Sequence, residues 1–217
     1  MRTKTLLLTA ALSAAGIVSS MAQAGAVYSV NAVGYVNTTL HAGYNLVSNP
    51  LTASDNSIKT LFASLPSGTQ VFKYNGTSFT TATKDDFTGE YLPAAAANAT
   101  VLPGEGVFVS LTGPDQTVTF VGEVPQGAAS NQQVPAGLSI RSSTVPQAGT
   151  VADLAFPGAP GDQIFKFNST TQAYTTYSFD DFTSTWLPTV PTLEVGEAVF
   201  VNKATAAAWN RNFSVNQ

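Results

Sequence analysis

The sequence predicts an all-β protein built from two tandem copies of one repeat, each a small sandwich or barrel with one short helix. Three observations predict this fold. Blocks of sequence recur in order, most segments alternate apolar and polar residues, and turn-forming residues separate those segments. We expect a signal peptide over 1–24, a first repeat with an N-terminal strand over 25–126, and a second repeat over 127–217.

Four blocks of the first half recur in the same order in the second half. The offset between matched blocks drifts by a few residues, so small insertions between them must lie in loops. The matched blocks are Val71–Asn75 with Ile164–Asn168, Asp85–Thr88 with Asp180–Thr183, Leu92–Pro93 with Leu187–Pro188, and Gly104–Val109 with Gly196–Val201. One supersecondary unit used twice explains this pattern.

Each copy is expected to begin with a strand, over Gly43–Val47 and over Gly137–Ile140. A short helix follows in the first copy, where Ser57 can cap it. Apolar residues then lie at helical spacing, namely Ile58, Leu61, Phe62 and Leu65. Thr150 can cap a weaker version of this helix in the second copy.

A hairpin comes next in each copy. Asn75-Gly76 predicts a two-residue type I′ turn, because both central positions of that turn need positive φ. The second copy has a longer turn over Ser169–Gln172. The expected strands are Gln70–Tyr74 and Thr77–Thr81 around the turn, followed by Gly106–Leu111 and Thr117–Val121. The expected inward core residues are Phe72, equivalent to Phe165, and Phe108, equivalent to Phe200.

The N-terminus reads as a secretory signal. Arg2 and Lys4 precede an apolar stretch, and Ala22-Gln23-Ala24 has the small-x-small pattern of a signal peptidase site. The stretch is too short for a spanning helix of about 20 residues, so we expect cleavage after Ala24 and no membrane span. The protein is then secreted, to the cell surface or the extracellular space.

Composition excludes several classes of function. Cleavage removes two of the nine basic residues and none of the 13 acidic ones, so the formal charge falls from −4 to −6 and a nucleic-acid partner is not expected. The chain has no Cys and one His, His41, which has no equivalent in the second copy. This composition argues against Ser-His-Asp and Cys-His catalysis and against His- or Cys-based zinc sites. Gly104-Glu105-Gly106 precedes a strand and is no phosphate loop.

Acidic residues recur in both copies. Asp85, Asp86, Asp180 and Asp181 could supply oxygen ligands to Ca²⁺, although their spacing is unlike an EF-hand loop, or they could shape turns through backbone amides. Glu105 and Glu197 could act as a glycosidase pair, but a duplicated structural position explains them with less. No cofactor is expected.

Tyr91 and Trp186 occupy matched positions, each before Leu-Pro. They could form a stacking platform for glycan rings, or they could anchor the long loop against the sheet as core aromatics.

The chain ends suggest a means of assembly. The strand Val33–Val36 is similar to Val121–Val124, and the chain stops where a further strand of this kind would begin. The first strand could complete the second repeat of another copy, as in donor-strand exchange, or both could be edge strands of one closed fold. The candidate assembly residues are Val27, Tyr28, Val30, Val33, Tyr35, Phe213 and Val215.

Three segments carry a resemblance to a known family: Tyr28–Val36, Gly43–Pro50 and Pro103–Val109. They resemble a family of uncharacterised secreted proteins associated with Verrucomicrobiota and related bacteria, over nearly the whole chain after the signal. The resemblance implies a bacterial source and export. That family carries no assigned function, so no catalytic residue can be transferred.

These observations favour a secreted, non-enzymatic structural protein. It would be a cell-surface or extracellular filament subunit that assembles with copies of itself through β-strand contacts. The alternative is an extracellular glycan-binding, adhesin-like module.

Overall fold

A computed structural model describes residues 32–215. The first repeat contains β1 (Val33–Leu40), β2 (Gly43–Ser48), α2 (Ile58–Leu61), β3 (Gln70–Tyr74), β4 (Phe79–Lys84), β5 (Tyr91–Leu92), α3 (Ala94–Ala97), β6 (Gly106–Leu111) and β7 (Gln116–Glu123). The second contains the 3₁₀ helix η2 (Gly127–Ser130), then β8 (Gln132–Val134), β9 (Gly137–Arg141), β10 (Gly149–Thr150), β11 (Gln163–Asn168), β12 (Ala173–Asp180), β13 (Thr185–Leu187), β14 (Thr192–Leu193), β15 (Val199–Lys203) and β16 (Ala207–Trp209).

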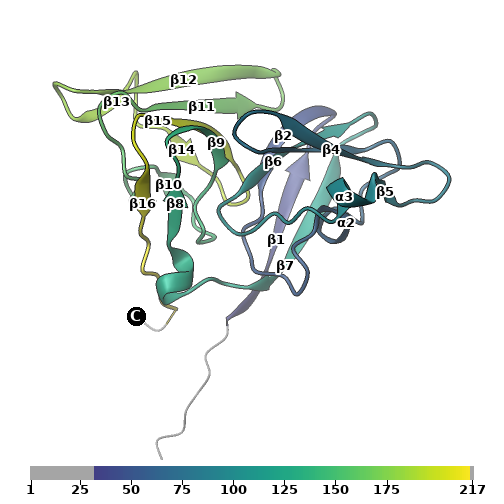
Figure 1. Cartoon of the computed structure of the whole chain (residues 1–217). Coiled ribbons are helices and arrows are strands. Elements are labelled where there is room, and N and C mark those ends of the chain that lie inside the picture. The colour runs from purple at the N-terminus through teal and green to yellow at the C-terminus, as the bar shows by residue number, and fades with distance from the viewer. Residues whose placement is uncertain (1–31, 216–217) are drawn as a thin grey trace, which may run out of the picture. The chain divides into compact units, whose positions relative to one another are not determined.

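The two repeats have matching five-stranded sheets, and the second repeat also has a short two-stranded sheet, β10-β14. The first has a five-stranded antiparallel sheet in the order β2-β6-β3-β4-β5, and the second has one in the order β9-β15-β11-β12-β13. Each repeat adds a two-stranded ribbon, β1-β7 in the first and β8-β16 in the second (Figure 1). The all-β class is therefore confirmed, and the matching strand orders support the duplication.

Each five-stranded sheet packs one face against its own ribbon. In the first repeat, Val71 and Val109 of the sheet share a core with Phe120 of β7 and Phe62 after α2. In the second repeat, Ile164 and Val201 share a core with Trp209 of β16 and Val134 of β8. The second core also contains Leu154. The two layers make each repeat a small sandwich.

The opposite faces of the two sheets meet each other. Leu46, Ile140, Ala198 and Phe200 are buried in a third cluster, to which both repeats contribute. The contact is reciprocal. The Ser48 amide donates to the Gly196 carbonyl at 2.8 Å, and the equivalent Ser142 amide donates to the Gly104 carbonyl at 3.0 Å. The two repeats thus pack as a symmetric dimer would.

The predicted core phenylalanines lie on this shared face, so their assignment to the core of each repeat is wrong. Phe72 pairs with Phe108 and Phe165 pairs with Phe200, which supports their equivalence. Side chains alternate along a strand, however, and Val71 and Ile164 take the positions that face each repeat's own core. Phe200 is buried, and the other three phenylalanines are half-buried.

The expectation of one helix per repeat is also wrong. The first repeat has two, and Ser57 precedes α2 without accepting a backbone amide in a side-chain cap; its hydroxyl donates to Asp55 at 2.9 Å. In the second repeat, residues 151–155 form turns. Thr150 does bond reciprocally with Asp153, as in a capping box, yet Ala155 at φ 55° ends the turn before a helix forms.

The first hairpin turn is wider than predicted. Tyr74 pairs with Phe79, which leaves four residues, 75–78, in the loop. The side chain of Asn75 accepts the amides of Thr77 and Ser78 at 3.0 and 2.8 Å, and Gly76 has φ 99°, whereas Asn75 has no positive φ. Asn75 therefore shapes the turn with its side chain. The loop of the second repeat spans residues 169–172, as expected, but it is no longer than the first, because the two extra residues, Asn168 and Ala173, pair with each other in the strands.

No helix in the described part of the chain is long and apolar enough to cross a membrane. The predicted signal peptide and the residues Val27, Tyr28 and Val30 lie outside the described residues.

Candidate functional site

An aromatic face lies where the two five-stranded sheets meet. It consists of rings that point away from the core of each repeat. They are Tyr44, Phe72, Tyr74, Phe79 and Phe108 of the first repeat and Phe165, Phe167, Tyr174 and Phe200 of the second. The rings contact each other across the repeats. Phe108 lies with its centroid 5.3 Å from that of Phe167 and 5.9 Å from that of Phe200.

Alternation along the strands builds this face. Phe72 and Tyr74 are two residues apart on β3, as the equivalent Phe165 and Phe167 are on β11. Residues two apart point to the same side of a sheet, so each strand contributes two rings to the face. Edge-to-face and tilted ring pairs of this kind stabilise packing beyond the area they bury, by about 0.5–1.5 kcal/mol per pair.

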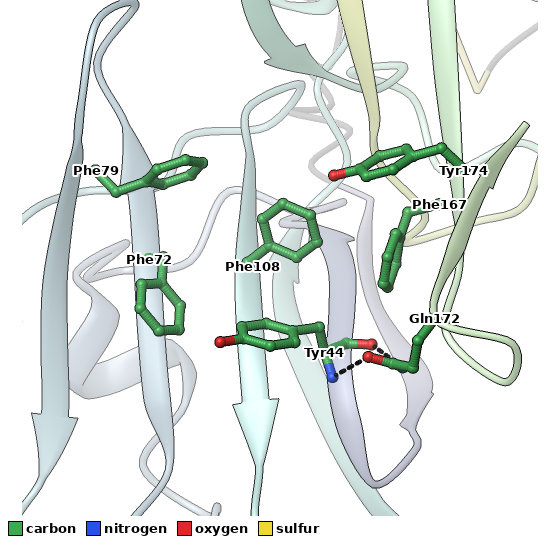
Figure 2. Close-up of a pocket in the computed structure, with 7 residues that line it drawn as sticks. All are labelled: Tyr44, Phe72, Phe79, Phe108, Phe167, Gln172 and Tyr174. Carbon is green, nitrogen blue, oxygen red and sulfur yellow. Dashed lines mark hydrogen bonds between the residues drawn. The ribbon is translucent and has the colours of Figure 1, made fainter. Parts of the chain in front are cut away.

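The face is hollowed into a first aromatic pocket of about 600 Å³. Figure 2 shows its lining, which is Tyr44, Phe72, Phe79, Phe108, Phe167, Gln172 and Tyr174. The Gln172 side chain closes one end, because it accepts the Tyr44 amide at 2.9 Å and donates to the Tyr44 carbonyl at 3.0 Å. Three of the rings are well exposed, at 47% for Tyr44, 44% for Phe79 and 48% for Tyr174.

A second aromatic pocket of about 330 Å³ lies beside Tyr174, and Leu138, Phe165 and Phe200 complete its lining. These residues are equivalent to Phe79, Tyr44, Phe72 and Phe108 of the first pocket, in that order. The duplication therefore produces two related pockets on one face. Leu138 in place of Tyr44 makes the second pocket the less aromatic of the two.

The chemistry of the first pocket is that of an apolar binding site. Its lining has no carboxylate, imidazole or amine. Its polar groups are the side-chain amide of Gln172, which is already hydrogen-bonded to the backbone of Tyr44, and two tyrosine hydroxyls. Partial burial raises the pKa of Tyr174 above its ordinary value. The arrangement can bury an apolar side chain or ligand.

The structure buries both predicted glycan-stacking residues, so that candidate site is wrong. Tyr91 is 4% exposed and donates its hydroxyl to the Phe62 carbonyl at 3.1 Å. Burial also raises the pKa of Tyr91 well above its ordinary value. Trp186 is 5% exposed and packs against Phe156 and Phe179. Both are core anchors, as the alternative interpretation held.

The predicted calcium candidates lie in two matching loops. Asp85 accepts the amides of Phe87 and Thr88 at 3.0 and 2.8 Å and the Thr88 hydroxyl at 2.9 Å. Asp180 does the same for Phe182 and Thr183, with distances of 3.1, 2.8 and 2.7 Å. These bonds lower the pKa of both carboxyls. One Asp of each pair thus shapes its turn. Among the described residues no cluster of three or more His, Cys, Asp or Glu side chains could hold a metal.

These loops present a feature that sequence reasoning missed. Phe87 and Phe182, at the tips, are each 99% exposed. The first loop connects β4 to β5, and the second connects β12 to β13. The recurring Asp-Asp-Phe-Thr motif carries this signal in the sequence, because a phenylalanine recurs beside the acidic pair in both turns.

The two recurring glutamates form ion pairs within their repeats. Glu105 binds Lys73 at 3.1 Å and accepts the Leu102 amide at 3.0 Å. Glu197 binds Lys166 at 3.0 Å and likewise accepts the Glu194 amide at 2.9 Å. The same bonds at the same place in each repeat support a structural role for both carboxylates.

His41 lies in a surface loop, where its ring binds the Asp115 carboxylate at 2.8 Å. Asp115 also accepts the Ala42 amide at 3.1 Å.

The predicted strand exchange fails for the described residues. Val33 and Tyr35 lie in β1, which pairs along its whole length with β7 of the same chain. The second repeat has its own equivalent ribbon, because β8 pairs with β16. Phe213 and Val215 are held by residues 126–130 of the same chain. No strand is missing from the second repeat, so none has to be supplied by another copy.

Comparison of the chain with known protein families, with curated protein sequences and with solved structures found no match. The candidate site therefore depends on the geometry of this chain.

Proposed function

We propose that this chain is a secreted, non-enzymatic structural subunit that assembles with other copies through its aromatic face. The observation that carries the proposal is the first aromatic pocket, where Tyr44, Phe79 and Tyr174 each keep almost half of their surface in solvent. Large exposed apolar patches mark interaction sites. The signal-like N-terminus supports export, and charged residues make up only 10% of the chain, which does little to prevent self-association.

Side-chain contacts replace the strand contacts that the sequence suggested. Fully burying one exposed Phe side chain contributes about 1.5–3 kcal/mol. The rings of the aromatic face are already more than half-buried, so several of them must be covered together to stabilise an association.

The test is sedimentation velocity of the chain over 25–217 across a range of concentrations, with electron microscopy of the same samples. We expect oligomers or fibres from the unchanged chain and mainly monomer from Phe79→Ser combined with Tyr174→Ser. The matched control is Tyr35→Ser, which removes an aromatic ring that is 72% exposed on β1, away from the face. A chain that stays monomeric at every concentration would refute the proposal.

Glycan binding is the second candidate, because exposed tyrosine faces can stack on sugar rings. Because Tyr91 and Trp186 are buried, the stacking residues of such a site would be Tyr44 and Tyr174. Sugars also need polar partners for their hydroxyls, and the lining of the first pocket offers few. A glycan array with the unchanged chain and with Tyr174→Ser distinguishes the two candidates. Retention of one glycan class by a monomer, lost on substitution, would favour this second function.

A further inference from the structure

The two loops that carry Phe87 and Phe182 are shaped to hold an apolar side chain in solvent. In each loop the aspartate side chain binds two amides and one hydroxyl, as described above, and a further backbone bond closes the turn. That bond runs from the Gly89 amide to the Asp85 carbonyl in the first loop and from the Ser184 amide to the Asp180 carbonyl in the second, at 3.0 Å in both. Five residues of loop are thus fixed by four hydrogen bonds. A rigid protrusion loses little conformational entropy when it binds.

An isolated exposed apolar residue needs no explanation. Here a phenylalanine is 99% exposed at the same place in both repeats, on the same hydrogen-bonded turn. Other apolar positions are also exposed in both repeats, such as Leu92 and Leu187 at 47% each, but no other large apolar side chain in the described part of the chain is as exposed as these two phenylalanines. Because the same phenylalanine is exposed on the equivalent loop of both repeats, a shared role in a contact explains the two residues better than chance exposure does.

The first aromatic pocket has the complementary properties. It is lined by six aromatic rings, has a volume of about 600 Å³ and contains no charged group. Its occupant should therefore be apolar, and an aromatic ring can meet the pocket rings edge-to-face. The hydroxyls of Tyr44 and Tyr174 have no hydrogen-bond partner within residues 32–215, so they can donate to an acceptor next to the entering ring. Asp86 and Asp181 each lie beside the phenylalanine of their loop and could be that acceptor.

Phe87 cannot enter the pocket of its own chain. Phe79 lines the pocket at the start of β4, and the loop leaves the far end of the same strand. Five steps of about 3.3 Å place Lys84 roughly 16 Å from Phe79 before the loop begins. The β12-β13 loop likewise leaves β12 at the end opposite Tyr174.

We propose that Phe87 or Phe182 of a second copy inserts into the first aromatic pocket, and that this contact joins subunits into the assembly. The proposal rests on the proposed function and names its contact. Loop tip and pocket are different surfaces, so the contact is heterologous. Repetition of a heterologous contact produces an open filament unless the rotation closes a ring. The second aromatic pocket is the equivalent site for the second tip.

Substitution at the tips is the first test. The described turn bonds use backbone atoms and the Asp and Thr side chains, so Phe87→Ser and Phe182→Ser should leave the fold and its melting temperature unchanged. We expect the double variant to associate about 10- to 150-fold more weakly than the unchanged chain, from the burial of one ring. The control is Tyr35→Ser, which should associate as the unchanged chain does. Equal association of the double variant and the unchanged chain would overturn the inference and leave the proposed function standing.

Cross-linking locates the contact directly. Replacing Phe87, or Phe182, by the photoreactive p-benzoylphenylalanine keeps an aromatic ring at the tip. Each variant is mixed with isotope-labelled unchanged chain and irradiated. At least one of the two variants should then form cross-links between copies. The linked peptides should come from the strands that carry Phe72, Phe108 or Phe167. Cross-links that are confined to other surfaces of the chain would overturn the inference. So would a monomeric chain whose tips cross-link only to lipid when vesicles are added. A chain that never associates would refute both it and the proposed function.

Discussion

Gly106 and Ala198 occupy equivalent positions in the two repeats and lie against each other. A Cβ atom added to Gly106 would come within 2.5 Å of the Ala198 Cβ and of the Ile140 Cγ2, and within 3.2 Å of the Val47 carbonyl oxygen. The backbones of the two repeats are therefore too close here for both positions to carry a Cβ atom. Glycine is needed at one position, and the duplication carries a small residue at each.

Gly106→Ala is expected to destabilise the protein. Overpacking of this kind costs about 1–3 kcal/mol in the free energy of unfolding, because the surrounding strands must shift. The measurement is chemical denaturation of the two variants side by side. The control, Gly113→Ala, adds the same methyl group where no atom lies within 4 Å, and should change the unfolding free energy little. Equal stability of the two variants would contradict the close contact.

Lys203 and Asp162 form a buried ion pair in the second repeat only, with side chains 1% and 0% exposed. Lys203→Leu alone should destabilise the protein by about 3–5 kcal/mol, because it leaves a carboxylate buried without its cation. Leu111 and Thr69 fill the equivalent positions of the first repeat, and both are buried. The double variant Lys203→Leu with Asp162→Thr should therefore recover most of the loss in denaturation experiments. A double variant as unstable as the single one would contradict this explanation.

The duplication and the strand class could be predicted because they leave local signals. Val71–Asn75 and Ile164–Asn168 share both their residues and their alternation, and both became strands. The choice of core face could not be predicted. In Val71-Phe72-Lys73-Tyr74 the large rings alternate with Val and with a Lys that pairs with Glu105. Both faces of the sheet are covered, so residue size does not distinguish the repeat's own core from the contact with the other repeat.

The candidate site was missed for the same reason. It is assembled from two repeats, and no single segment shows that Tyr44 and Gln172 will bond to each other. The matched aromatic positions Tyr91 and Trp186 gave a clearer local signal, and that signal reflected burial. The ribbon of the second repeat was hidden because β8 and β16 are three residues long each, too short for the match with β1 and β7 to appear.

Removal of calcium is expected to leave stability unchanged. In each acidic loop one carboxylate already binds the backbone, through Asp85 in the first and Asp180 in the second. The turns are thus held without an ion. Calorimetry of the protein with and without a chelator should give the same melting temperature. A clear fall with chelator, restored by added calcium and absent in Asp86→Asn with Asp181→Asn, would revive the metal site.

Acid should loosen the two loops through their aspartates. Hydrogen bonds from the Thr88 amide and hydroxyl lower the pKa of Asp85 below its ordinary value of 3.8, and those from Thr183 do the same for Asp180. A carboxyl whose pKa is lowered by folding contributes stability above its unfolded pKa, and that contribution is lost as the pH falls through the folded pKa. Asp85→Asn with Asp180→Asn should therefore lower the melting temperature at neutral pH.

The difference in melting temperature between this variant and the unchanged chain should stay constant down to about pH 4 and shrink below it, as the aspartates become protonated. The control is Asp86→Asn with Asp181→Asn, because neither side chain makes the turn bonds. A difference that persists unchanged to strongly acidic pH would show that the negative charges of Asp85 and Asp180 do not hold the loops. If the loops do carry the contact between copies, association should weaken over the same pH range, because a mobile Phe87 loses more entropy on entering the pocket.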